Sequence, residues 1–232
     1  MDESFAHGLG LHVHIRTQIV RFWSYNLAVG VTIGDDILEV QGAADSTHVT
    51  NEYWVNYEYQ GDFDEGIGGF PVIYQIQSPS KRSFTIDLGK MYPKQKIVLS
   101  TWNEFVRVDF VNGNEEAFGN STGLLGDFKT GKLLARDGVT ELNDFYDFGS
   151  EWQVQPAEPM LFHFVRQPQF PASCIEPDSP RGQRSRRRLN EVTVTEAMAE
   201  EACARLKRNA VDYKDCVFDV LATQDLNMVE AY

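Results

Sequence analysis

The sequence predicts a mainly β protein: an antiparallel β-sandwich over residues 8–155, then a linker over 156–192 and a small helical hairpin over 193–232. Short runs in the first segment alternate apolar with polar side chains, which is the period of half-buried strands. Turn-forming residues separate these runs at short intervals, and no helical period lies between them, as in an antiparallel sandwich. Beyond residue 193 the apolar side chains recur at helical spacing. A sheet-rich domain joined to a helical module accounts for all three observations.

The alternation is clearest in three runs, whose apolar members are Leu11, Val13, Ile15, Phe84, Ile86, Leu88, Val106, Val108 and Phe110. The turns between runs are predicted at Gly34-Asp35-Asp36, Asp64-Glu65-Gly66, Tyr92-Pro93-Lys94 and Asn112-Gly113-Asn114. His12 and His14 lie two positions apart, so a strand places both on one face. That face is either a metal-binding pair or, more simply, a polar surface exposed to water.

Prolines interrupt this pattern between residues 156 and 190 and exclude regular structure over most of that segment. A dense positive run follows, with five arginines between residues 181 and 188. Within it Arg184, Arg186 and Arg187 fit the dibasic pattern that secretory processing proteases recognise. A charged, solvated linker is the simpler interpretation of the same residues.

The last segment has the features of two short helices. Thr193 and Glu196 fit a capping box at the first helix, and the second helix has an apolar face made of Tyr213, Cys216, Val217, Val220 and Leu221. Cys203 and Cys216 both face the interior of the predicted hairpin, so a disulfide between them is geometrically reasonable and would contribute about 3 kcal/mol. Cys174 could instead pair with either cysteine, and a reduced pair in a cytosolic protein is the alternative.

Composition and charge exclude some functions. Hydrophobic residues make up 42% of the chain, enough for a packed core. The formal net charge of −13 argues against nucleic-acid binding, because a duplex-binding surface needs clustered Lys and Arg. No apolar run approaches the ~20 residues that span a bilayer. Residues 1–4 lack the pattern of a signal peptide, which taken alone predicts a cytosolic protein.

Two segments carry the most specific information. The first is Thr122-Gly123-Leu124-Leu125-Gly126-Asp127-Phe128, and the second is Phe148-Gly149-Ser150-Glu151-Trp152-Gln153-Val154. Glycine is needed where the backbone turns with positive φ, and the aromatic second segment has the composition of an inward-packing strand anchored by Trp152. Together they resemble the end of a von Willebrand factor type D domain, and the resemblance covers residues 8–154.

Residues 10–17 and 31–40 are also similar to strands of that family, and residues 202–220 resemble a reduced form of the eight-cysteine helical module that commonly follows it. The resemblance implies a non-catalytic extracellular or cell-surface module for adhesion, scaffolding or protein–protein assembly. It implies a fragment of a larger secreted protein, with a signal peptide outside this chain and with other extracellular proteins or glycans as partners. In that setting Asn120, which begins Asn120-Ser121-Thr122, is an acceptor for N-glycosylation.

Three departures limit what the resemblance implies. Leu125 stands where the family has a cysteine, and we expect it to fill that site as a buried apolar residue. The family's opening Asp-Pro-His strand is missing, and with it one calcium ligand. Asp127 matches the first ligand of the family's calcium loop and Asp137 lies downstream, but Lys129 and Lys132 place positive charge there. Either calcium binds this loop, or backbone turns alone hold it.

Two other functions remain as alternatives. One is a calcium-dependent binding module, and the other is a carbohydrate-active hydrolase on a β-sandwich, with catalytic carboxylates on loops such as residues 62–65. The sequence contains no Gly-x-Ser-x-Gly elbow, no His-Glu-x-x-His helix and no phosphate-binding glycine loop. We therefore expect a protein without enzymatic activity and without a cofactor other than calcium.

Overall fold

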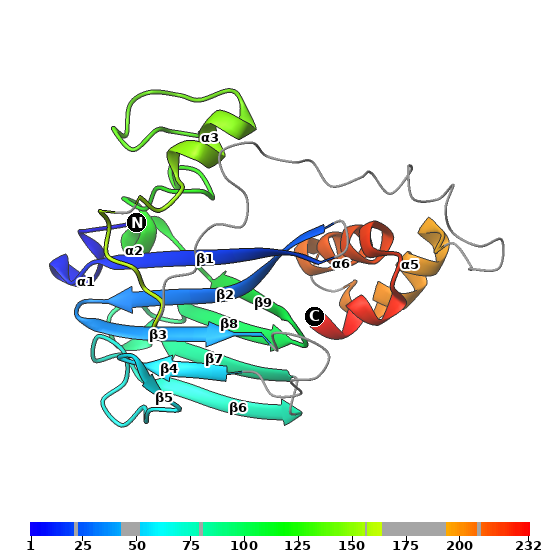
Figure 1. Cartoon of the computed structure of the whole chain (residues 1–232), viewed down its shortest axis with the longest axis horizontal. Helices are drawn as coiled ribbons and strands as arrows, with labels where there is room; N and C mark the ends of the chain where they lie inside the picture. Colours follow the sequence, from blue (N-terminus) through cyan, green and yellow to red (C-terminus); the bar gives the residue numbers. More distant parts are fainter. Residues whose placement is uncertain (21–22, 43–51, 79–80, 156, 164–193, 208–209) are drawn as a thin grey trace. The chain divides into compact units, whose positions relative to one another are not determined.

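The computed structural model describes residues 1–20, 23–42, 52–78, 81–155, 157–163, 194–207 and 210–232 (Figure 1). The chain forms two compact units, one made of Met1–Thr17 with Asn26–Arg166 and the other of Gln18–Tyr25 with Gln167–Tyr232. Most of the predicted 156–192 linker lies outside the described residues. Cys174 and the dibasic residues Arg184, Arg186 and Arg187 lie outside them as well.

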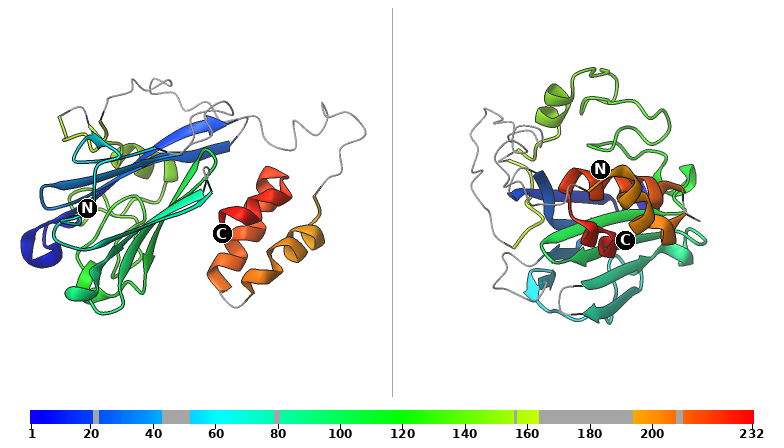
Figure 2. Two further views of the ribbon diagram at one scale, coloured as in Figure 1. Left: turned by 90° about the horizontal axis from the view of Figure 1, so that it is seen from below. Right: turned by 90° about the vertical axis from the view of Figure 1, so that its right-hand side faces the viewer.

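Apart from the end of β1 (Leu11–Val20) and the start of β2 (Trp23–Ile33), the first unit contains two antiparallel sheets, which the left view of Figure 2 shows as two layers. The five-stranded sheet has the order β1, β2, β3 (Asp36–Gln41), β4 (Glu52–Val55) and β5 (Glu58–Tyr59). The four-stranded sheet has the order β6 (Val72–Ser78), β7 (Lys81–Asp87), β8 (Lys96–Trp102) and β9 (Phe105–Val111). The predicted class, a mainly β protein with layered antiparallel sheets and a few short helices, is confirmed.

The core lies between the two sheets and follows the predicted alternation. Along β7 and β8 every second side chain is buried, and Phe84, Ile86, Ile97 and Leu99 are at most 1% exposed. The facing sheet contributes buried residues to the same cluster, which include Val29, Val31, Ile33, Leu38 and Val40. Burial of such apolar surface is the main term that stabilises a sandwich.

The N-terminal residues belong to this core. Phe5, in α1 (Phe5–Gly8), is 1% exposed, and its ring centroid lies 5.4 Å from that of Tyr92 and 5.8 Å from that of Phe118. Tyr92 also accepts a hydrogen bond at its hydroxyl from the Ala6 N–H (3.0 Å). Phe118 ends α2 (Glu115–Phe118), and Tyr92 follows η1 (Leu88–Lys90). The sandwich therefore begins before residue 8.

Over Leu27–Ile33 and Leu38–Gln41, strands β2 and β3 are buried on both faces. On the face away from the core, Glu39 and Gln41 are 1% and 3% exposed. Residues 157–163, hereafter the covering segment, run across this face, as the yellow trace of Figure 1 shows. Gly30 makes room for them, because a Cβ at Gly30 would lie 2.7 Å from the carbonyl oxygen of Leu161. These residues fall in the predicted linker, so the compact unit is longer than the range 8–155.

The predicted closing strand around Trp152 is wrong. Residues Phe145–Glu151 form helix α3, because the Asp144 carboxylate accepts the N–H groups of Tyr146 (2.8 Å) and Asp147 (3.1 Å) and so caps its first turn. Trp152 ends this helix half-buried, and its indole N–H donates to the carbonyl of Leu134 (2.9 Å).

The second unit contains helices α5 (Glu196–Ala202) and α6 (Ala210–Thr223), with η2 (Cys203–Leu206) between them and η3 (Leu226–Ala231) at the end. Helix α5 begins later than predicted. Its N-cap is Thr195, whose hydroxyl accepts the Met198 N–H (3.3 Å), while Thr193 of the predicted capping box lies outside the described residues. The predicted apolar face of α6 buries Cys216 and Val220 completely. Among the described helices, none has both the length and the apolar character that crossing a membrane would require.

Candidate functional site

The glycine-rich turn over residues 121–128 is tied to the N-terminus of the chain. The terminal ammonium group donates to the Thr122 carbonyl (2.8 Å), and the Thr122 N–H donates to the Met1 carbonyl (3.2 Å). Gly126 has a φ of +90°, and a Cβ there would lie 3.2 Å from the carbonyl oxygen of Lys132. Glycine is therefore required at this position, as the motif predicts.

The turn presents its two leucines to solvent. Leu124 is 52% exposed and Leu125 is 79% exposed. The prediction that Leu125 is buried in place of a family cysteine is therefore wrong. Phe128, at the end of the turn, is 41% exposed and keeps one contact with the core, 6.1 Å between its ring centroid and that of Phe118. The glycine turn thus holds apolar side chains outward on a backbone fixed at both ends.

The two predicted calcium ligands each cap a separate turn. Asp127 accepts both the N–H (2.8 Å) and the hydroxyl (2.6 Å) of Thr130. Asp137 accepts the N–H (2.8 Å) and the hydroxyl (2.6 Å) of Thr140, and also the N–H of Val139 (2.8 Å). In each case the hydrogen bond from the threonine side chain, followed by those from the backbone, lowers the pKa of the carboxyl. Local turn formation explains both residues.

These residues do not fit a calcium site. Calcium takes six to eight oxygen ligands, several of them carboxylates. Glu141, a nearby acidic residue, is paired with the Lys132 ammonium group (2.6 Å). Across the residues that the structure describes, no group of three or more His, Cys, Asp or Glu side chains could hold a metal ion. Asp127 and Asp137 therefore support the turns themselves.

Asn120 is exposed immediately before the glycine turn. Its amide donates to the hydroxyl of Ser4 (2.8 Å), and the neighbouring Ser121 hydroxyl donates to the carboxylate of Asp2 (3.0 Å). Both bonds add to the contacts between this turn and residues 1–4.

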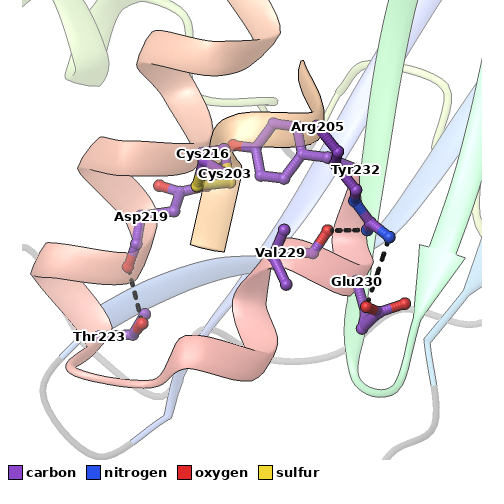
Figure 3. Close-up of a disulfide and its surroundings, with 8 residues drawn as sticks. All are labelled: Cys203, Arg205, Cys216, Asp219, Thr223, Val229, Glu230 and Tyr232. Atoms are coloured by element: carbon purple, nitrogen blue, oxygen red, sulfur yellow. Dashed lines mark hydrogen bonds and ion pairs between the residues drawn. A yellow bond between two sulfur atoms is a disulfide. The ribbon is translucent and has the colours of Figure 1, made fainter. Parts of the chain in front are cut away.

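The predicted pair of cysteines forms a disulfide (Figure 3). Cys203 and Cys216 are both fully buried, with their Cα atoms 6.0 Å apart. The chain end packs beside them, where the Tyr232 hydroxyl donates to the Asp219 carboxylate (2.6 Å) and Arg205 donates to the Val229 carbonyl (2.6 Å). The disulfide therefore joins the start of η2, directly after α5, to the middle of α6.

A buried carboxylate that the sequence did not reveal fastens the covering segment. Glu39 accepts the main-chain N–H of His163 at 2.7 Å, and its oxygens lie 3.0 Å from Nδ1 of the same residue. The imidazole stacks on Trp54, with 3.9 Å between ring centroids. In the middle of the segment the Tyr57 hydroxyl donates to the Met160 carbonyl (3.1 Å). The only sequence signal for this contact was the charge of Glu39, which lies between the buried residues Leu38 and Val40.

Arg136 connects the covering segment to helix α3. Its guanidinium pairs with the Glu158 carboxylate, donates to the Glu151 carbonyl (2.7 Å) and lies over the Trp152 ring (5.2 Å). The two histidines of β1 have different surroundings: Nε2 of His12 lies 3.2 Å from the Glu3 carboxylate, whereas His14 is half-buried with its Nδ1 atom shielded from solvent. Burial, followed by the charge of His12, lowers the pKa of His14 to about 4.

The loop proposed for a hydrolase forms an ordinary turn. The Gly66 N–H donates to the Phe63 carbonyl (2.9 Å), while Asp62, Asp64 and Glu65 are exposed. Comparison of the chain with protein-family models, with curated proteins and with solved structures yields no match.

Proposed function

We propose that this chain is a non-catalytic extracellular module of von Willebrand type D character that assembles with other extracellular proteins through the glycine turn. The exposed pair Leu124 and Leu125 carries this proposal, because the loop holds large apolar side chains in water on a backbone that is bonded to residues 1–4, through the Thr122 N–H to the Met1 carbonyl and the Ser121 hydroxyl to Asp2. Apolar surface of this kind is typical of interaction sites when it is presented by a fixed loop.

The disulfide supports the extracellular setting. Structural disulfides form and persist in oxidising compartments, and Cys203–Cys216 is buried at the centre of a small helical unit. The exposed acceptor Asn120 is compatible with the same compartment. Binding through the leucine pair needs no calcium, because Asp127 and Asp137 are engaged within their own turns.

The experiment compares retention of the secreted protein on the surface and matrix of the producing cells. The full chain is expressed behind an added signal peptide, and the bound fraction is measured for the unmodified chain, for Leu125→Ser and for Val139→Ser. Val139 is the matched control because it is an apolar residue, 82% exposed, in a different turn. We expect Leu125→Ser to lower the retained fraction about tenfold, the loss expected when about 1.4 kcal/mol of apolar contact is removed.

Two results would contradict the proposal. Equal retention of the two serine variants would show that the leucine pair is not the contact. Free thiols at Cys203 and Cys216 in the secreted protein, measured by alkylation and mass spectrometry, would argue against the extracellular setting.

A further inference from the structure

Strand β6 is an exposed edge of the four-stranded sheet. In the described part of the chain β7 is its only strand neighbour. Its seven residues, Val72-Ile73-Tyr74-Gln75-Ile76-Gln77-Ser78, carry no charge, and Ile73 and Ile76 are 45% and 63% exposed. An uncharged edge strand with exposed β-branched residues is a template for pairing with another strand.

The other three edges carry the features that prevent such pairing. Strand β1 carries His12 and Arg16, and the main chain of Asp2 bridges to it at Leu11. Strand β5 has only two residues, one of them a glutamate. Strand β9 carries an ion pair between Arg107 and Asp109 (2.8 Å). Charges and short length are two of the usual protections of edge strands, and β6 has neither; its one irregularity is a register shift between Ile76 and Ser78, at the end of the strand.

The ladder with β7 defines which main-chain groups of β6 point outward. The Asp87 N–H donates to the Pro71 carbonyl (2.9 Å), and the register continues with Val72 opposite Ile86. In an antiparallel ladder, hydrogen-bonded pairs alternate with pairs that are not hydrogen-bonded. The N–H and C=O groups that face the open edge therefore belong to Val72, Tyr74 and Ile76.

We propose that this edge binds the β6 strand of a second copy of the chain, antiparallel and centred on Gln75. In this register Tyr74 of each copy lies opposite Ile76 of the other, and the two pairs exchange about four main-chain hydrogen bonds. An aromatic residue opposite a β-branched one is a favourable cross-strand pair, and the Tyr74 ring is held in place for it by stacking on Phe84 of its own copy, with 4.7 Å between ring centroids. Gln75 lies opposite its own copy at the two-fold axis.

Charge favours β6 over other surfaces for self-association. The chain has a formal net charge of −13, so two copies repel each other through most of their surfaces. Pairing at β6 brings no charged side chain of the strand into contact. A two-fold pairing also uses each β6 edge once, so assembly stops at a dimer. This surface is separate from the glycine turn, and the inference does not depend on the function proposed there.

The register can be tested by charge exchange at Gln75, an exposed residue whose replacement leaves the core intact. Sedimentation equilibrium is measured for the full, disulfide-bonded chain and for Gln75→Lys, Gln75→Glu and an equimolar mixture of the two. Like charges directly opposite each other destabilise a strand pair, and opposite charges stabilise it. The unmodified chain should sediment at twice 26.3 kDa, each single variant should dissociate at least tenfold more readily, and the mixture should recover the dimer. Val111→Lys, on the opposite edge strand β9, is the matched control and should remain dimeric.

Three outcomes would overturn the proposal. The first is an unmodified chain that stays monomeric at about 1 mM, the weak limit of specific association. The second is a pair of Gln75 variants that dimerise as the unmodified chain does, or a mixture of them that stays monomeric. The third is a Val111→Lys variant that dissociates as readily as Gln75→Lys, because association would then depend on total charge and not on β6.

Discussion

Replacing Glu39 by glutamine is expected to loosen the covering segment from the five-stranded sheet. The carboxylate is 1% exposed, accepts the His163 N–H at 2.7 Å and lies 3.0 Å from Nδ1 of its ring. A hydrogen bond to a charged group contributes about 1.5–3 kcal/mol, and a neutral one contributes about 0.5–1.5 kcal/mol. Weakening both bonds by about 1 kcal/mol each lowers the free energy that holds the segment by about 2 kcal/mol.

Hydrogen exchange of the amides in residues 157–163 measures this free energy, because they exchange when the segment detaches. A loss of about 2 kcal/mol corresponds to exchange about 30-fold faster. Glu58→Gln is the control, since Glu58 is an exposed carboxylate on the same sheet and its replacement should leave the exchange unchanged. Unchanged exchange in Glu39→Gln, or equal acceleration by both variants, would refute the reasoning.

Three further predictions concern pH, the disulfide and calcium. The pKa of His14 is about 4 in the folded chain, lowered from an ordinary value of 6.5. The unfolded state therefore binds an extra proton between these two values, and stability falls as the pH decreases from 6.5 to 4. We expect the free energy of unfolding to fall by about 2 kcal/mol, a value reduced because solvent reaches part of the ring. Urea unfolding at pH 7 and at pH 4.5 measures this fall, which should be absent in His14→Gln. An identical fall in that variant would contradict the assignment to His14. Cys216→Ser should lower the free energy of unfolding of the second unit by about 3 kcal/mol, as measured by circular dichroism, and Cys203→Ser should lower it by the same amount. Addition of calcium to about 1 mM should change the Tm of the chain by no more than about 1 °C. A clear rise in Tm would show that Asp127 and Asp137 give up their hydrogen bonds in the turns to bind the ion.

The strands were predictable because local alternation and the buried face coincide. Phe84 and Ile86 on β7 show this directly, since each is fully buried between half-exposed neighbours. The disulfide was predictable for a similar reason, because helical spacing places Cys203 and Cys216 inside the same hairpin. In both cases the structure depends on neighbours that are close in the sequence.

The remaining features depend on contacts between distant residues. The bond between Glu39 and His163 spans 124 positions, and neither residue lies in a pattern that indicates the other. The covering segment was therefore assigned to the linker. Phe148 and Trp152 suggested a strand by composition, but the Asp144 cap directs the local backbone into a helix. Leu125 was expected to be buried because the family has a cysteine at this position, but a leucine forms no disulfide that would hold it in the core.

Strand order follows chain order in both sheets, which has a consequence for how the protein folds. Each strand meets its partner across a single connection, so ladder formation costs little loop-closure entropy, and we expect it to precede the long-range steps. Those steps are the docking of the N-terminal residues, where Ala6 meets Tyr92 across 86 positions, and of His163 on Glu39. During synthesis both sheets can therefore assemble before residue 163 leaves the ribosome, and the strand that emerges last need not displace any earlier pairing.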